Sequence, residues 1–119
     1  VVRLETFCKG IYDGSANDNG RPEKISEKMI YKFLGITSYG FKNMPKCMAV
    51  YERYVESYEE SWARKIVWAY NKLKKENTTI YWSYLRKLSG VKKESYQKAS
   101  PFLEKYTDRE TYTDILKIG

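Results

Sequence analysis

Residues 80–101 read IYWSYLRKLSGVKKESYQKASP, and residues 25–45 repeat their pattern as ISEKMIYKFLGITSYGFKNMP. In both segments an isoleucine is followed ten residues later by a glycine, then by a β-branched residue, and five residues after that by an aromatic one. The offset between equivalent positions is a constant 55 until the closing proline, where it becomes 56. A shared spacing of apolar residues with different polar ones indicates a duplicated supersecondary unit.

The composition is that of a folded domain. Hydrophobic residues make up 42% of the 119 positions and aromatic ones 16%, which is enough apolar material for one ordinary core or two small ones. No apolar run is long enough to span a bilayer, and no signal-peptide pattern is present. Because the chain begins at Val1, we expect it to be a piece of a longer protein.

The absence of histidine limits the chemistry of the chain. It removes Ser-His-Asp and Cys-His catalysis, the commonest general base and the ordinary zinc spacings. There is also no phosphate-binding glycine loop. We therefore expect no enzyme, no cofactor and no metal in this segment. Cys8 and Cys47 are expected to be small buried residues, with a disulfide between them as the alternative.

Positive charge is concentrated in the second half of the chain. Residues 64–98 contain ten Lys/Arg and two acids, whereas residues 47–63 contain one arginine and four glutamates. This pattern favours an oriented surface that faces a polyanion. The alternative is a solvated lysine face that only keeps the protein soluble.

Apolar spacing predicts helices throughout and no strand. The expected helices cover residues 4–12, 27–34, a short segment ending near 44–45, 44–57, 61–76, 80–88, 92–99 and a last one from residue 101. Ser26, Thr37 or Ser38, residues 75–79 and Ser100 are the expected N-caps. Residues 107–119 are expected to form a tail or a docking helix.

Helix, glycine turn and helix, with buried residues at fixed offsets, is typical of the helix-turn-helix. After the glycine, the buried positions would be Ile36, Phe41 and Met44 in the first copy and Val91, Tyr96 and Ala99 in the second. The predicted fold is all-α, with two tandem three-helix helix-turn-helix units joined by a bridging helix. The predicted boundaries are residues 1–46 for the first unit, 47–60 for the bridging helix, 61–106 for the second unit and 107–119 for the tail or helix.

One position departs from the usual pattern. The residue four before the turn glycine is ordinarily alanine because the two helices cross closely there, but this chain has Tyr31 and Arg86. Either the helices splay at this point or the unit is a looser three-helix variant.

The second helix of each pair would enter a major groove, so its exposed side chains are the candidate DNA contacts. We expect Asn43 and Gln97 to read base edges, since amides pair bidentately with adenine, and Lys42 or Lys98 to reach guanine. The alternative for the two amides is a helix-end cap or plain surface polarity. The full set of candidates is Ser38, Tyr39, Lys42, Asn43, Lys46, Arg86, Lys87, Lys92, Lys93, Ser95, Gln97 and Lys98. Of these, Arg86, Lys87, Lys92 and Lys93 are expected at phosphates.

Two tryptophans lie outside the main apolar faces of their expected helices and have basic neighbours. For Trp68 and Trp82 we expect packing within the protein. The functional alternative is a partner hot spot or stacking on a sugar or base.

Several segments resemble the C-terminal part of target-site selector proteins of the TnsD/TniQ family, from bacterial Tn-seven-like transposons. They are residues 20–25 (GRPEKI), 28–36 (KMIYKFLGI), 42–47 (KNMPKC), 62–66 (WARKI), 69–91 (AYNKLKKENTTIYWSYLRKLSGV) and 100–106 (SPFLEKY). The resemblance implies binding to a chromosomal attachment site and recruitment of a transposition ATPase or another transposase subunit. The family's zinc-binding cysteine cluster has no counterpart here.

The sequence thus predicts specific binding to double-stranded DNA, in a cytoplasmic, nucleoid-associated protein with no membrane partner. The alternative is an all-α adaptor whose aromatic surface binds another protein.

Overall fold

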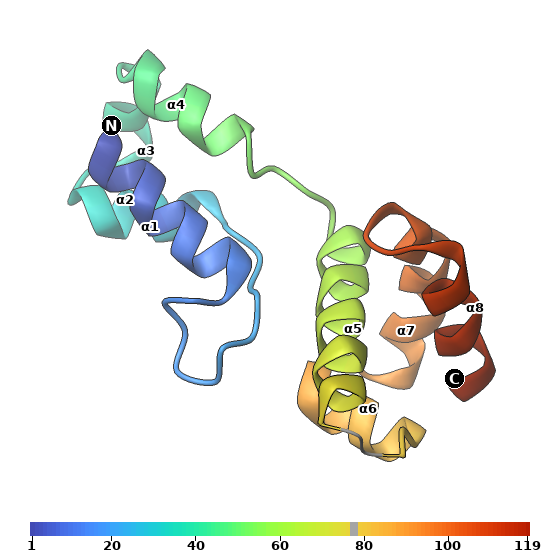
Figure 1. Ribbon diagram of the computed structural model, residues 1–119. Coiled ribbons are helices and arrows are strands. Elements are labelled where there is room, and N and C mark those ends of the chain that lie inside the picture. Colours follow the sequence, from blue (N-terminus) through green and yellow to red (C-terminus); the bar gives the residue numbers. More distant parts are fainter. Residues whose placement is uncertain (77–78) are drawn as a thin grey trace. The chain divides into compact units, whose positions relative to one another are not determined.

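The protein is all-α. The computed structural model describes residues 1–76 and 79–119, and within these ranges every regular element is a helix, as the sequence predicted (Figure 1). The chain divides into two compact units, Val1–Glu56 and Ser57–Gly119, each with its own hydrophobic core. We describe each unit by itself.

The first unit contains four helices. They are α1 (Val2–Asp13), α2 (Glu27–Leu34), α3 (Ser38–Lys42) and α4 (Pro45–Glu52). The helix α1 contacts α2 and α4, and α4 also contacts α3. Their apolar faces meet in a core of Leu4, Cys8, Ile25, Ile30, Phe41, Cys47 and Val50, all of them buried.

The loop after α1 is held by specific turns. Gly14 ends the helix at a φ of 88°, and a Cβ on it would lie 2.2 Å from the Gly20 carbonyl oxygen, so only glycine fits. The Asn17 side-chain amide donates to the carbonyls of Ile11, at 3.2 Å, and Arg21, at 2.7 Å. These bonds close the loop and return the chain toward Ile25 and α2.

The predicted helix–glycine–helix element of the first unit is present as α2, Gly35 and α3. The Ser26 hydroxyl accepts a hydrogen bond from the Met29 N–H and caps α2, and the Thr37 hydroxyl accepts one from the Gly40 N–H and caps α3. Gly35 has a φ of 68°, and its N–H donates to the Tyr31 carbonyl. Gly35 therefore forms the predicted glycine turn, and it does so in a left-handed conformation.

The predicted bridging helix over residues 47–60 is wrong. The helix α4 belongs to the first unit and ends at Glu52, and α5 (Tyr58–Lys75) begins in the second unit. The physical reason is the start of α5, where the Ser57 hydroxyl accepts from the Glu60 N–H and the Glu60 carboxylate accepts from the Ser57 N–H. This capping box gives Ser57 an extended backbone and so interrupts a continuous helix. The boundary between the units falls at residues 56 and 57 instead of 46 and 61.

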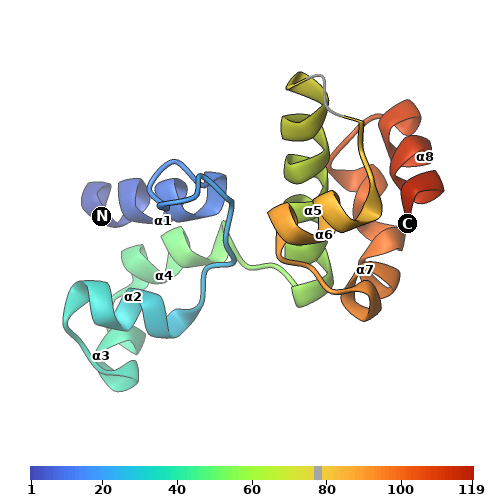
Figure 2. The same cartoon turned by 90° about the horizontal axis from the view of Figure 1, so that it is seen from below.

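The second unit is built around α5. It also contains α6 (Trp82–Ser89), α7 (Lys93–Ala99), the 3-10 helix η1 (Ser100–Lys105) and α8 (Arg109–Ile118). The helices α6 and α7 contact α5 (Figure 2), and η1 contacts both α5 and α8. The core consists of Ala63, Ile66, Val67, Ala69, Tyr70, Leu73, Leu85, Val91, Tyr96, Ala99, Leu103 and Ile115. Six of these residues lie on α5, which therefore supplies half of the core.

The second helix–glycine–helix element is α6, Gly90 and α7. Gly90 has a φ of 72° and its N–H donates to the Arg86 carbonyl, as Gly35 does to Tyr31. The helix α6 begins at Trp82, two residues later than expected, and Tyr81 precedes it without a side-chain cap. Two of the expected cap residues, Asn77 and Thr78, lie outside the described residues.

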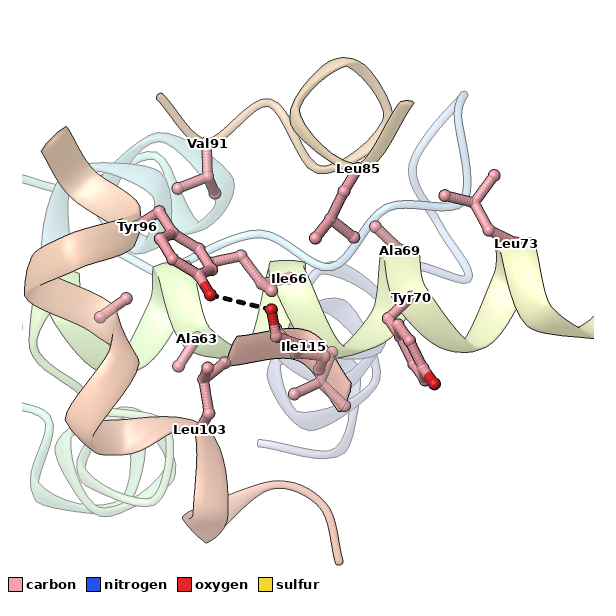
Figure 3. Packing of buried hydrophobic residues seen from close by; sticks show 12 residues of the cluster. Ala63, Ile66, Ala69, Tyr70, Leu73, Leu85, Val91, Tyr96, Leu103 and Ile115 are labelled. Carbon is pink, nitrogen blue, oxygen red and sulfur yellow. Dashed lines mark hydrogen bonds between the residues drawn. The ribbon is translucent and has the colours of Figure 1, made fainter. Parts of the chain in front are cut away.

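The end of the chain is a helix that packs on the core. Ile115 of α8 is fully buried, and the Tyr96 hydroxyl donates to its carbonyl at 3.0 Å (Figure 3). The Tyr70 hydroxyl donates to Asp114 at 3.1 Å.

The predicted cap at Ser100 is wrong, because α7 runs directly into η1 and the Ser100 hydroxyl donates to the Gln97 carbonyl. The second unit is therefore larger than the three-helix bundle that the sequence predicted.

Candidate nucleic-acid interface

The candidate residues of the second unit gather around the turn between α6 and α7. Arg86 and Lys87 lie in the last turn of α6, and Lys92 precedes α7. The other four lie on α7 and are Lys93, Ser95, Gln97 and Lys98. All seven side chains are exposed except that of Ser95, which is half-buried.

The core fixes which face of α7 is exposed. Tyr96 and Ala99 are buried, and so is Val91 just before the helix, as the sequence predicted. Tyr96 is held from two sides, because its ring packs edge-on against Trp82 at 4.9 Å and its hydroxyl bonds to α8. Residues 93, 94, 97 and 98 consequently lie on the opposite, solvent-facing side of α7.

The cations of this region have few acids nearby. Glu94 is the only acid between residues 77 and 103. In the part of the chain that the structure describes, Arg86, Lys87, Lys92, Lys93 and Lys98 form no ion pair. Their charges therefore face solvent around one turn, with Glu94 as the one nearby acid in the sequence.

Arg86 occupies the position where a small residue was expected, and its side chain points out to solvent. With Ser83, Lys87, Gly90, Val91 and Lys92 it lines a shallow groove of about 420 Å³ beside the turn. The equivalent Tyr31 of the first unit packs edge-on against Phe41 at 5.4 Å, and its hydroxyl donates to Glu27 at 2.7 Å. The same position thus extends into solvent in one unit and packs on the partner helix in the other.

The candidate residues of the first unit do not share one helix. Ser38, Tyr39 and Lys42 lie on α3, which has only five residues, whereas Lys46 lies in the first turn of α4. Asn43 is the C-cap of α3, and its amide donates to the Tyr39 carbonyl at 3.4 Å. Asn43 therefore caps the end of α3, which is the alternative to base reading given above for this residue. Of the predicted buried positions, Phe41 is buried, while Ile36 and Met44 are partly buried.

Both tryptophans singled out from the sequence pack within the second unit. Trp68 and Trp82 are partly buried against the core of that unit. The Lys72 ammonium lies 5.2 Å from the centre of the Trp68 ring, a cation–π distance. These contacts agree with the packing interpretation.

Glu94 adds one negative charge to this region of the second unit. It is exposed on the outward face of α7, one turn before Lys98.

Other kinds of site find little support. In the described residues no group of three or more His, Cys, Asp or Glu side chains is arranged to hold a metal ion. Cys8 and Cys47 are buried free thiols, and burial raises the pKa of Cys8. No helix within the described ranges is long and apolar enough to cross a membrane.

Comparison of the chain with family models, curated proteins and solved structures finds no match.

Proposed function

We propose that this protein binds double-stranded DNA in a sequence-specific manner, with α6, Gly90 and α7 acting as a helix-turn-helix. The observation that supports this most directly is the two-sided character of α7. One side is anchored in the core by Tyr96 and Ala99, and the other presents exposed cations and an amide without ion-pair partners in the described chain. A rigid helix with a polar, positively charged outer face suits a major groove.

Within this proposal the side chains divide into two roles. Arg86, Lys87, Lys92 and Lys93 lie at the turn and the start of α7, where they would bind phosphates and fix the register. Gln97 would pair with adenine and Lys98 with guanine in the major groove. Ser95 is half-buried, so its hydroxyl would reach only the edge of the contact.

The first unit would act as a second reader or as a scaffold. Its exposed Ser38, Tyr39, Lys42 and Lys46 are available for DNA contacts. Asn43 would have to exchange its cap to Tyr39 for a base contact, which makes it a weaker candidate than Gln97.

The biological setting that we propose is target-site selection for a Tn-seven-like transposon. It rests on the resemblance to TnsD/TniQ selectors in residues 20–106. In this setting the protein would act on bacterial chromosomal DNA in the nucleoid, and a transposition ATPase or another transposase subunit would be its protein partner.

A second candidate function is an all-α adaptor that binds another protein. It is favoured by exposed aromatic side chains in both units, with Tyr39 76% exposed, Tyr81 58% and Tyr84 47%. Tyr81 and Tyr84 pack edge-on at 5.5 Å and so present one aromatic surface.

Salt dependence distinguishes these two functions. Fluorescence anisotropy would measure the affinity of the whole chain for random and bacterial genomic duplexes between about 50 and 200 mM salt. If Arg86, Lys87, Lys92, Lys93 and Lys98 each neutralise one phosphate, log Kd should change with log salt with a slope of magnitude about 4.5. Absence of salt-dependent duplex binding at micromolar protein contradicts the DNA proposal, whereas an aromatic protein interface would respond little to salt.

Recognition of the DNA sequence is tested by substitutions on the outer face of α7. Replacing Gln97 and Lys98 together by alanine should reduce discrimination between preferred and random duplexes more than it reduces affinity for random DNA. The matched control is Lys117→Ala, an exposed lysine on α8. Equal loss on every sequence would reassign Gln97 and Lys98 to backbone contacts.

A further inference from the structure

A shallow groove lies beside Gly90 on the basic surface of the second unit. Its walls are the last two turns of α6 and the start of α7, and its lining side chains are Ser83, Arg86, Lys87, Val91 and Lys92. Ser83, Arg86 and Lys87 are three and four residues apart, so they share one side of α6. Lys92 reaches the same groove from across the turn because Gly90 reverses the chain in a left-handed conformation.

The chemistry of the groove favours an anion. Three cationic side chains and one hydroxyl line it, and none of the three cations is paired with a carboxylate in the described part of the chain. Like charges around one concavity repel one another, and a bound anion relieves that repulsion. Val91 also lines the groove, but its side chain is only 2% exposed.

Arg86 gives the groove a preference for phosphate. Its guanidinium is planar and always charged, and it donates two parallel hydrogen bonds to tetrahedral oxyanions. Ser83, one turn earlier, adds a hydroxyl donor to a third oxygen.

The first unit has a different residue at three of the four equivalent positions, and only Lys87 has a lysine counterpart, Lys32. With the offset of 55, Ser83, Arg86 and Lys92 correspond to Lys28, Tyr31 and Thr37. The Tyr31 ring packs on Phe41 and its hydroxyl is bonded to a carboxylate. The Thr37 hydroxyl is used as the cap of α3.

We infer that the groove between α6 and α7 is a binding site for a single phosphate group, with Arg86 as its anchor and Ser83, Lys87 and Lys92 as further donors. This inference deepens the proposed function, since on duplex DNA the group would be one phosphodiester beside the turn. A free phosphate or phosphate monoester has the same chemistry, and the two sources are separated below.

The direct test uses inorganic phosphate as the probe and the whole chain. Backbone amide NMR spectra are recorded while sodium phosphate replaces sodium chloride at constant ionic strength. We expect saturable shifts centred on residues 83–92. Arg86→Gln should weaken this binding by about tenfold, Arg86→Lys should weaken it less, and Lys117→Gln should leave it unchanged.

The folded state of each variant is checked in the same spectra. Arg86 is exposed, so the dispersed resonances of buried Ile66 and Tyr96 should keep their positions in Arg86→Gln. Shifts that do not saturate, that spread over all exposed lysines, or that persist unchanged in Arg86→Gln would overturn the site.

A second measurement on duplex DNA separates this inference from the proposed function. If the groove holds a phosphodiester, Arg86→Gln should lower the salt slope of duplex binding by about one and weaken all sequences equally. Saturable phosphate binding by a protein that binds no duplex would support the groove as a site for a free phosphate. The same result would contradict the DNA proposal. Duplex binding that Arg86→Gln affects no more than Lys117→Gln would show that the groove holds no phosphodiester, and it would leave the DNA proposal standing.

Discussion

The two units share a pattern of buried residues and differ in the surface built upon it. Ile30, Phe41 and Gly35 of the first unit have the same roles as Leu85, Tyr96 and Gly90 of the second. The first unit, residues 1–56, has nine basic and seven acidic residues, whereas residues 57–119 have thirteen and eight, so the net charges are +2 and +5. The two units therefore share the buried residues of the helix–glycine–helix element and differ in the charge of their exposed residues.

The grooves of the two units show the same divergence. In the first unit a groove of about 390 Å³ is lined by Val1, Met44, Pro45, Lys46 and Cys47, which are mainly apolar. In the second unit the groove of about 420 Å³ is lined by three cations and lies directly at the turn. Under the proposed function, the second unit would therefore make the main electrostatic contact with DNA.

The largest expected effect comes from truncating equivalent core residues. Ile30 and Leu85 are both fully buried, in separate clusters. Ile30→Ala and Leu85→Ala should each cost about 2–5 kcal/mol of unfolding free energy. Because each unit has its own core, amide hydrogen exchange should accelerate within residues 1–56 for Ile30→Ala and within residues 57–119 for Leu85→Ala.

Duplex binding in these two variants sharpens the comparison. Leu85→Ala should abolish it, and Ile30→Ala should retain a large part of it if the second unit makes the main contact. Equal loss in the two variants would show that both units are needed. Accelerated exchange in both units for either variant would contradict the independence of the two cores.

A smaller effect is expected at the turn glycines. Gly14 has a φ of 88° and no room for a Cβ, whereas Gly35 has a φ of 68° and no heavy atom within 4 Å of the Cβ position. Gly35→Ala should cost only the left-handed backbone penalty of about 1–2 kcal/mol. Gly14→Ala adds a clash with the Gly20 carbonyl and should cost more, which chemical denaturation monitored by circular dichroism would measure. A smaller loss for Gly14→Ala than for Gly35→Ala would contradict the loop geometry.

Much of the helical framework could be predicted because its signals are local. Gly35 and Gly90 occupy left-handed positions that other residues avoid, and Ser26 and Thr37 stand at extended positions before helices. Periodic burial marks Phe41 and Tyr96 in the same way.

The bridging helix was mispredicted although a local signal was present. The apolar run through Val50, Tyr54 and Val55 imitates a continuous helix, but the Ser-x-x-Glu pattern at Ser57 and Glu60 is a helix start. The packing of α8 on the core was harder to predict from the sequence. It depends on hydrogen bonds from Tyr70 and Tyr96 to residues of α8 that lie 44 and 19 positions further along the chain.

The sequence predicted which charged residues surround the turn of the candidate site, but it predicted their arrangement in space only in part. The cations around Gly90 are visible in the sequence as a charge cluster. Whether a large side chain at the fourth position before the glycine packs or projects depends on tertiary neighbours, as Tyr31 and Arg86 show. The cap made by Asn43 likewise appears only once α3 has ended at Lys42.

The smallest expected effect is a difference in acid sensitivity between the units. In the second unit the Lys105 ammonium bonds to the Glu60 carboxylate, which also accepts from the Ser57 N–H and holds the start of α5 against η1. The Lys105 bond, followed by the Ser57 bonds, lowers the pKa of Glu60 from 4.5 to about 2. In the first unit the Arg53–Glu5 pair is exposed on the surface, where such pairs contribute little.

A carboxyl group with a lowered pKa in the folded state stabilises the protein above its unfolded pKa, and this contribution is lost as the pH falls through the folded value. The Glu60 contribution should therefore be complete above about pH 4.5 and disappear toward pH 2. Hydrogen exchange measured across this range should accelerate more in α5 and η1 than in α1 and α4. Lys105→Met should remove much of the difference while leaving the Ser57 cap in place, and an unchanged acid response in that variant would show that the pair does not link α5 to η1.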